Sequence, residues 1–121
     1  MKSDLDSMLM NIFFTYAWRL RKLKCECGCG KFLPREINKA CMDHTLEKSP
    51  YPECKYSVQN IKYYTLDCHT NKGNGFPNEE QQKHIDWAME NKEMLTRESS
   101  TFVDRIMSKL KLEDNVIYNK E

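Results

Sequence analysis

The chain has 121 residues, enough for one domain with a modest core but too few for an enzyme that encloses a large substrate. Its 19 basic and 18 acidic residues give a formal net charge of +1, so composition alone does not indicate a nucleic-acid-binding protein. No stretch has the length of a membrane span, and acids lie where a signal peptide would need basic residues. We therefore expect an intracellular, cytoplasmic protein without a membrane segment.

Residues 1–24 are predicted to form an N-terminal helix. Apolar residues recur at spacings of three and four from Leu5 to Leu23, Ser3 is placed to cap the helix, and Asp4 and Asp6 fall in its first turn. We expect a basic segment around its end to contact phosphate groups, with a solvated helix end as the alternative. The candidate residues of that segment are Arg19, Arg21, Lys22 and Lys24.

Cysteines dominate the segment that follows, which begins Cys25-Glu26-Cys27-Gly28-Cys29-Gly30. All six cysteines of the chain precede residue 69 and gather around the histidines. Without an export signal, metal ligation by thiolates is a better interpretation than disulfide bonding. The glycines let the backbone turn tightly, so residues 25–36 are predicted to form a metal-binding knuckle.

A hairpin and a short helix are predicted next. Residues 40–46 and 61–66 are favoured as strands, and the two prolines within residues 49–52 place a loop between them. A helix should begin near Asp67 and stop at the Gly-Asn-Gly-Phe-Pro sequence of residues 73–77. This arrangement is a ββα unit within residues 25–76.

Two helices are predicted for residues 77–121. Asn78, followed by Glu79, Glu80 and Gln81, resembles a capping box for a helix that ends near residue 95. A further helix should begin near residue 99 or 100, and we expect the two to pack as an antiparallel pair on the N-terminal helix. The predicted fold is therefore a single α+β domain, 1–121, with a ββα core between helical flanks.

The candidate catalytic residues are Asp43, His44, Asn60 and His69. An acid, two imidazoles and an amide that converge on one point are able to hold a divalent cation and activate a water. His44 is suited to act as a general base if one ring nitrogen is fixed by a hydrogen bond. Asn60, at the start of the second strand, is placed to fix it across the hairpin. The pattern therefore indicates cleavage of phosphodiester bonds.

The order Asp-His, then Asn, then Cys-His-x-x-Lys resembles the HNH endonucleases, and in particular phage-type members of that family. The blocks that carry the resemblance are residues 43–49, 51–53, 59–61 and 68–72. It covers residues 25–75, and the separation between Asn60 and His69 is similar to that of the family. The resemblance implies a ββα-metal core, cleavage of DNA, and a phage or mobile-element context with partners from that setting.

The resemblance also implies roles for individual residues. His44 would be the general base, Asp43 and His69 would bind a catalytic cation such as magnesium, manganese or nickel, and Asn60 would hold the loop that orients His44. Lys72, or the basic segment, would contact a flanking phosphate. The oligomeric state is not indicated.

A structural zinc ion is the second expected metal. Zinc-containing HNH proteins have a Cys-x-x-Cys pair before the metal-binding histidine, but Thr65 occupies the first position of that pair here. The knuckle still provides three sulfurs, and Cys68 is a fourth. The predicted ligands are therefore Cys25, Cys27, Cys29 and Cys68, with Cys41 or Cys54 as possible replacements. A catalytically silent zinc-binding protein that binds DNA or acts as an adaptor is the alternative function.

Overall fold

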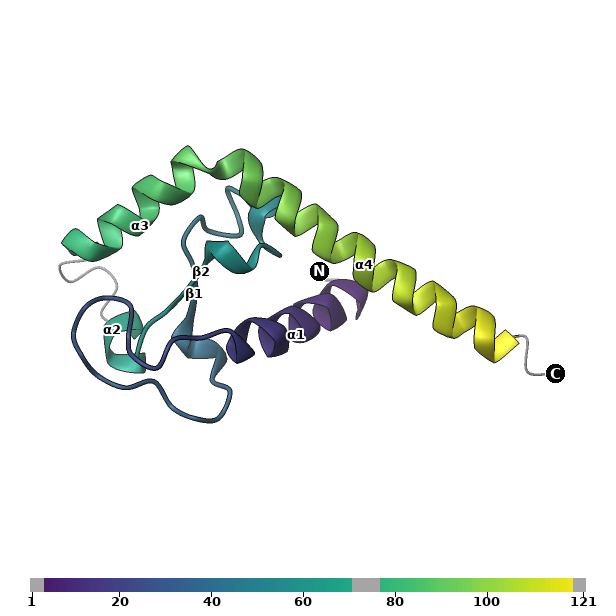
Figure 1. Ribbon diagram of the computed structural model, residues 1–121, viewed down its shortest axis with the longest axis horizontal. Helices are drawn as coiled ribbons and strands as arrows, with labels where there is room; N and C mark the ends of the chain where they lie inside the picture. Colours follow the sequence, from purple (N-terminus) through teal and green to yellow (C-terminus); the bar gives the residue numbers. More distant parts are fainter. Residues whose placement is uncertain (1–3, 71–76, 119–121) are drawn as a thin grey trace.

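The computed structural model describes residues 4–70 and 77–118, with side chains up to residue 68 in the first range and residue 111 in the second. Within these residues the fold is α+β, with four α-helices and one two-stranded antiparallel sheet (Figure 1). The helices are α1 (Asp4–Arg19), α2 (Leu66–Thr70), α3 (Glu79–Glu90) and α4 (Lys92–Tyr118), and the strands are β1 (Met42–His44) and β2 (Ile61–Tyr63). No helix in the described ranges is long and apolar enough to cross a lipid bilayer.

The hairpin is built on short strands with a long connection. Met42 pairs with Tyr63, Asp43 with Lys62, and His44 with Ile61. Residues 45–60 join the strands and contain two 3-10 turns, Pro52–Cys54 and Val58–Asn60. A third 3-10 turn, Lys39–Cys41, leads into β1, so the predicted strands are present but shorter than residues 40–46 and 61–66.

Helix α1 packs against the hairpin and supplies five of the eleven buried residues of the main core. Its acids lie in the first turn and Arg19 in the last, as the helix dipole favours. Phe13 is completely buried, and its ring contacts those of Phe14, Tyr56 and Phe102. Leu9 and Phe13 of the apolar stripe predicted from the sequence are therefore core, whereas its members Leu5, Met8, Tyr16, Leu20 and Leu23 are exposed. The helix ends at Arg19 rather than near residue 24.

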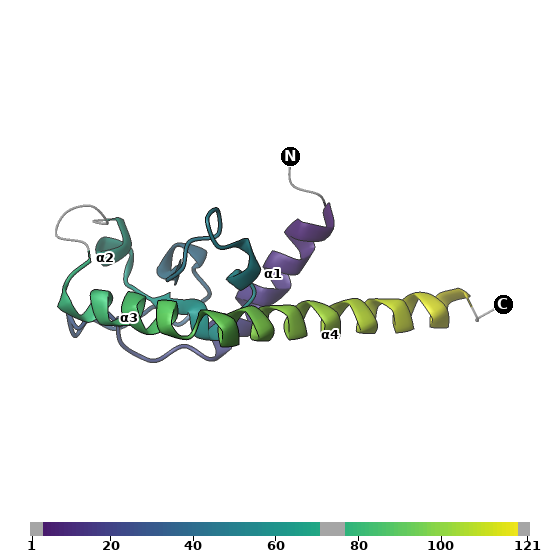
Figure 2. The same cartoon turned by 90° about the horizontal axis from the view of Figure 1, so that it is seen from above.

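Helices α3 and α4 do not form the antiparallel pair expected from the sequence. Asn91 alone separates them, and its backbone N–H and side chain both donate to the Trp87 carbonyl. One residue is too short a connection to reverse the chain, so α4 continues away from α3 after a bend (Figures 1 and 2). The capping box is confirmed, because Asn78 and Gln81 exchange hydrogen bonds between side chain and backbone.

The first half of α4 covers the loop of the hairpin, and its second half projects beyond the rest of the molecule (Figure 2). Leu95 is completely buried in a small second core with Leu46, Cys54 and Ala88. Because Leu95 already belongs to α4, the boundary predicted near residue 99 was placed about two turns too late.

Candidate metal centre and candidate active site

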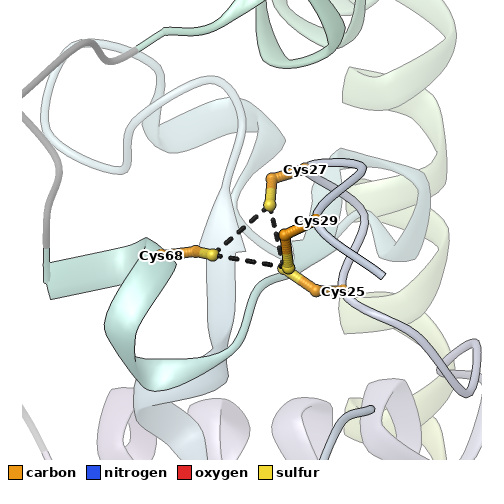
Figure 3. Close-up of side chains that lie close together, drawn as sticks. All are labelled: Cys25, Cys27, Cys29 and Cys68. Carbon is orange, nitrogen blue, oxygen red and sulfur yellow. Dashed lines mark hydrogen bonds between the residues drawn. The ribbon is translucent and has the colours of Figure 1, made fainter. Parts of the chain in front are cut away.

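Four cysteines lie together in space although one of them is about forty residues from the others. The Sγ atoms of Cys25, Cys27, Cys29 and Cys68 all lie within 4.8 Å of one another (Figure 3). A zinc ion bound tetrahedrally at about 2.3 Å from each sulfur would separate the sulfurs by about 3.8 Å. The Cys27–Cys68 and Cys29–Cys68 separations are 3.3 and 3.7 Å. The cluster can therefore hold a structural metal such as zinc.

The local backbone explains how three cysteines in five residues converge. Gly28 and Gly30 have φ values of 90° and 81°, in the left-handed region that residues with a Cβ rarely adopt. Leu33 N donates to Leu23 O and Cys25 N to Lys31 O, so the chain returns beside itself and closes the knuckle. The sulfurs then face Cys68, which α2 presents from the other side.

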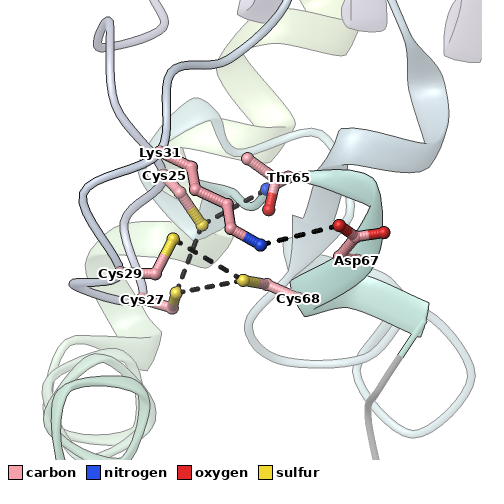
Figure 4. Close-up of polar contacts among 7 residues, drawn as sticks. All are labelled: Cys25, Cys27, Cys29, Lys31, Thr65, Asp67 and Cys68. Carbon is pink, nitrogen blue, oxygen red and sulfur yellow. Dashed lines mark hydrogen bonds and ion pairs between the residues drawn. The ribbon is translucent and has the colours of Figure 1, made fainter.

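The positions around the cluster further support metal ligation. Thr65, the residue three positions before Cys68, donates its backbone N–H to Cys25 Sγ at 3.2 Å (Figure 4). Lys31 Nζ forms an ion pair with Asp67 at 3.6 Å and joins the knuckle to α2. N–H groups aimed at sulfur stabilise thiolate ligands and fix their orientation.

The thiols of the cluster differ in their acid–base properties. Burial raises the pKa of Cys27, and the hydrogen bonds with Cys25 and Cys68 raise it further. For Cys29, slight burial acts upward, but the backbone of Lys31 and the neighbouring thiols outweigh it and lower the pKa to about 7. Cys29 therefore loses its proton more readily than Cys27. A cation bound by the sulfurs would favour the thiolate form of all four cysteines.

The two other cysteines lie elsewhere. Cys41 is buried in the main core, and burial raises its pKa. Cys54 is completely buried in the second core, where its sulfur lies 3.5 Å from Thr96 Oγ1. Neither belongs to the four-sulfur cluster, so the alternative ligand sets with Cys41 or Cys54 are not favoured.

His44 ends β1 and is held by the loop of the hairpin. Its Nε2 lies 2.8 Å from the Lys55 carbonyl oxygen. Because a carbonyl oxygen only accepts, Nε2 carries the hydrogen and Nδ1 of a neutral ring keeps its lone pair. Burial lowers the pKa of His44 to about 4, although the Lys55 hydrogen bond opposes this change. The imidazole is therefore neutral near pH 7.

Aromatic side chains of α1 cover the His44 ring. The ring centroids of Phe13 and Phe14 lie 6.1 and 5.9 Å from that of His44. Only 8% of His44 is exposed. Nothing in the sequence indicated that these aromatic residues would contact the candidate base.

Asn60 connects the two ends of the loop that surrounds His44. Its Oδ1 accepts from Leu46 N at 2.8 Å, while its Nδ2 donates to Leu46 O at 3.1 Å and Cys54 O at 3.3 Å. Thr45 N also donates to Asn60 O at 2.8 Å. Asn60 does not bond to the His44 ring directly; it holds the residues next to His44 and next to Lys55.

Asp43 and His69 are the predicted ligands of the catalytic cation. Asp43 is 6% exposed and pairs with Lys62 across the hairpin. His69 belongs to α2, which follows β2 closely, but its side chain lies outside the described residues. Within the described residues the four cysteines form the group of potential metal ligands.

The predicted phosphate-binding residues that the structure describes make different local contacts. Arg21 stacks on Trp18 and donates to the carbonyls of Trp18 and Arg35. Lys22 pairs with Glu26 at 3.5 Å. The remaining members are Arg19, which lines a groove between α1 and α4; Lys24, which lies over the Phe32 ring; and Lys72, which is outside the described residues.

Comparisons with known protein families, with curated proteins and with solved structures found no match to this chain. The resemblance to the HNH endonucleases therefore rests on the motif residues alone.

Proposed function

We propose that this protein is a metal-dependent endonuclease of the HNH type that hydrolyses phosphodiester bonds of DNA, with His44 as the general base. The observation that carries the proposal is the hydrogen bond between His44 Nε2 and the Lys55 carbonyl, at 2.8 Å. It orients the ring and leaves Nδ1 as the acceptor for a proton. A neutral imidazole fixed through its second nitrogen is the form that a general base requires.

In this proposal His44 Nδ1 takes a proton from the water that attacks the phosphorus atom. Asn60 is a positioning residue, because it ties together the loop segments on both sides of the base. Asp43 supplies a carboxylate from the neighbouring position of β1, and His69 supplies an imidazole from α2. A divalent cation such as magnesium, manganese or nickel at these two side chains would stabilise negative charge on the phosphate.

The four-sulfur cluster has a structural role in the proposal. It joins the knuckle to α2, the helix that carries His69, and so fixes that helix relative to the hairpin. A bound zinc ion would make this connection rigid, because four protein ligands leave no position open for a substrate.

The second candidate function is a catalytically silent zinc-binding protein that binds DNA or acts as an adaptor. The burial of His44 favours it, since the Phe13 and Phe14 rings leave 8% of the residue exposed to a substrate. A general base must reach the attacking water. The two functions therefore differ in whether the protein cleaves DNA.

Nicking of a supercoiled plasmid tests the proposal. We expect cleavage by the native protein with magnesium, manganese or nickel, and a loss of at least about 100-fold in His44→Gln, which retains a donor for the Lys55 carbonyl but no base. Asp86→Asn, an exposed substitution on α3, is the matched control and should cleave normally. Absence of metal-dependent cleavage by the native protein, or full activity of His44→Gln, would reject the proposal.

A further inference from the structure

A second concave site lies where the end of α1, strand β2 and helix α3 meet. Its volume is about 460 Å³, within the range of about 300–1,000 Å³ typical of small-ligand sites. The polar and aromatic residues that line it include Lys22, Glu26, Lys62, Lys83, His84 and Trp87. None of them is among the proposed catalytic residues.

Trp87 gives the pocket an aromatic surface. Trp87 is 38% exposed, whereas the other tryptophan, Trp18, is 5% exposed and donates its Nε1 hydrogen to Arg35 O. The next residue on α3, Ala88, is buried in the second core, so the helix is anchored on one side and presents Trp87 on another. A large aromatic ring that the core leaves open is suited to stacking against a planar ligand.

The charges of the pocket are mostly positive. Three lysines line it, against the single carboxylate of Glu26. The Glu26 side chain is 7% exposed, and it already accepts a hydrogen bond from Tyr63 N at 2.9 Å. One buried carboxylate cannot neutralise three ammonium groups, so an anionic ligand is favoured.

Two of these lysines are held only loosely. Lys62 Nζ lies 4.0 Å from Glu26 Oε1 and 5.9 Å from the centre of the Trp87 ring. Lys83 forms a surface ion pair with Glu80 at 3.9 Å, a kind of contact that contributes little to stability. Both ammonium groups are therefore available to a phosphate beside the indole.

The pocket begins next to the proposed catalytic site. Lys62 is the cross-strand partner of Asp43, and directly paired residues of an antiparallel sheet have Cα atoms about 4.5–5.5 Å apart and side chains on one face. A strand of nucleic acid that leaves Asp43 would therefore reach Lys62 first and Trp87 after it.

We propose that this pocket binds a nucleotide of single-stranded DNA, with the base stacked on Trp87 and the flanking phosphates bound by Lys62 and Lys83. Stacking on an aromatic side chain suits any base but needs a base that is free of its duplex neighbours. The position of this nucleotide beside a cleaved bond rests on the proposed nuclease function. The binding of single-stranded DNA in the pocket does not depend on that function.

Fluorescence anisotropy of a labelled oligothymidylate tests the binding, with the full chain in buffer without added magnesium, manganese or nickel. Trp87→Ala should weaken binding at least about tenfold, while Trp87→Phe, which keeps a ring, should retain most of the affinity. Met89→Ala, a neighbouring exposed apolar residue of α3, is the matched control and should bind normally.

The dependence on salt tests the phosphate contacts. Lys62→Gln and Lys83→Gln should each reduce the slope of log K against log salt by about 0.7, whereas Lys111→Gln on the exposed surface of α4 should leave it unchanged. A duplex of the same length should bind equally well to the native protein and Trp87→Ala.

Native-like affinity of Trp87→Ala for the single strand, or absence of binding by the native protein, would overturn the pocket proposal. Binding that depends on Trp87 without any plasmid cleavage would support the pocket and reject the nuclease. Plasmid cleavage that requires His44, together with single-strand binding that Trp87→Ala does not weaken, would support the nuclease and overturn the pocket.

Discussion

Asn60 and Leu46 exchange two hydrogen bonds, from Leu46 N to Asn60 Oδ1 at 2.8 Å and from Asn60 Nδ2 to Leu46 O at 3.1 Å. The side-chain amide of Asn60 thus bonds both the N–H and the carbonyl of Leu46, as the backbone of a neighbouring β-strand would. Asn60 is completely buried. The loop around His44 depends on this single side chain for three of its hydrogen bonds.

We predict that Asn60→Ala lowers the free energy of unfolding by about 3 kcal/mol, because the substitution leaves buried backbone groups of Leu46 and Cys54 without partners. Urea denaturation measures the loss. Asn11→Ala on the exposed surface of α1 is the control and should change stability by less than about 0.5 kcal/mol. An equal effect of both substitutions would contradict the structural role given to Asn60.

Metal analysis tests the four-sulfur cluster. The purified native protein should contain about one tightly held zinc ion per chain, and removal of the zinc by a chelator should lower the melting temperature. Cys68→Ser should lose the zinc, because it removes the ligand that joins α2 to the knuckle. Cys54→Ser, a buried cysteine outside the cluster, should keep it. A native protein that is folded and free of metal would refute the assignment.

Much of the fold was predictable because it follows from local patterns. The apolar spacing of residues 5–23 predicted the helix α1 but only part of its core face, since it included Leu9 and Phe13 and missed Phe14 and Trp18. Asn78 with Gln81 predicted the start of α3. The boundary between α3 and α4 was not predictable in this way. The backbone of Asn91 leaves the helical conformation, with φ −107° and ψ 19°, and its side chain donates to Trp87 O. An asparagine within a helical pattern carries no strong signal of a break.

In the candidate site, the sequence identified side chains that gather together but not the backbone groups that hold them. The four cysteines were chosen correctly as a cluster, because closely spaced thiols with a fourth near a histidine are typical of metal ligands. The Lys55 carbonyl that holds His44 and the Thr65 N–H that donates to Cys25 are backbone groups. Every residue has these groups, so the sequence could not identify them.

Phe13 links the core to the candidate base, and its removal should affect both. It is completely buried and its ring contacts those of Tyr56, Phe102 and His44. We predict that Phe13→Ala lowers the free energy of unfolding by about 3–5 kcal/mol, as for other large core rings. Tyr16→Ala on the exposed side of α1 should cost much less, although its ring lies near Phe102. Thermal denaturation compares the two variants. A similar loss of stability in both would contradict the central place of Phe13 in the core.

The stability of the protein should depend on pH through Glu98. Partial burial opposes its ionisation, but hydrogen bonds from the Gln59 backbone N–H, the Ser57 hydroxyl and the Gln59 side chain outweigh burial and lower the pKa below 4.5. A carboxyl group whose pKa is lower in the folded state stabilises the fold above its unfolded pKa, and this contribution is lost as the pH falls through the folded pKa.

We therefore predict that Glu98→Gln is less stable than the native protein by about 1 kcal/mol at pH 7, a value that allows for the partial exposure of the carboxylate. The difference should narrow as the pH falls below about 4.5, where the native carboxylate takes up its proton. Urea denaturation at a series of pH values measures it. Glu36→Gln, an exposed loop substitution, should show no such trend. A constant difference between Glu98→Gln and the native protein across this range would show that the hydrogen bonds, and not the charge, carry the effect.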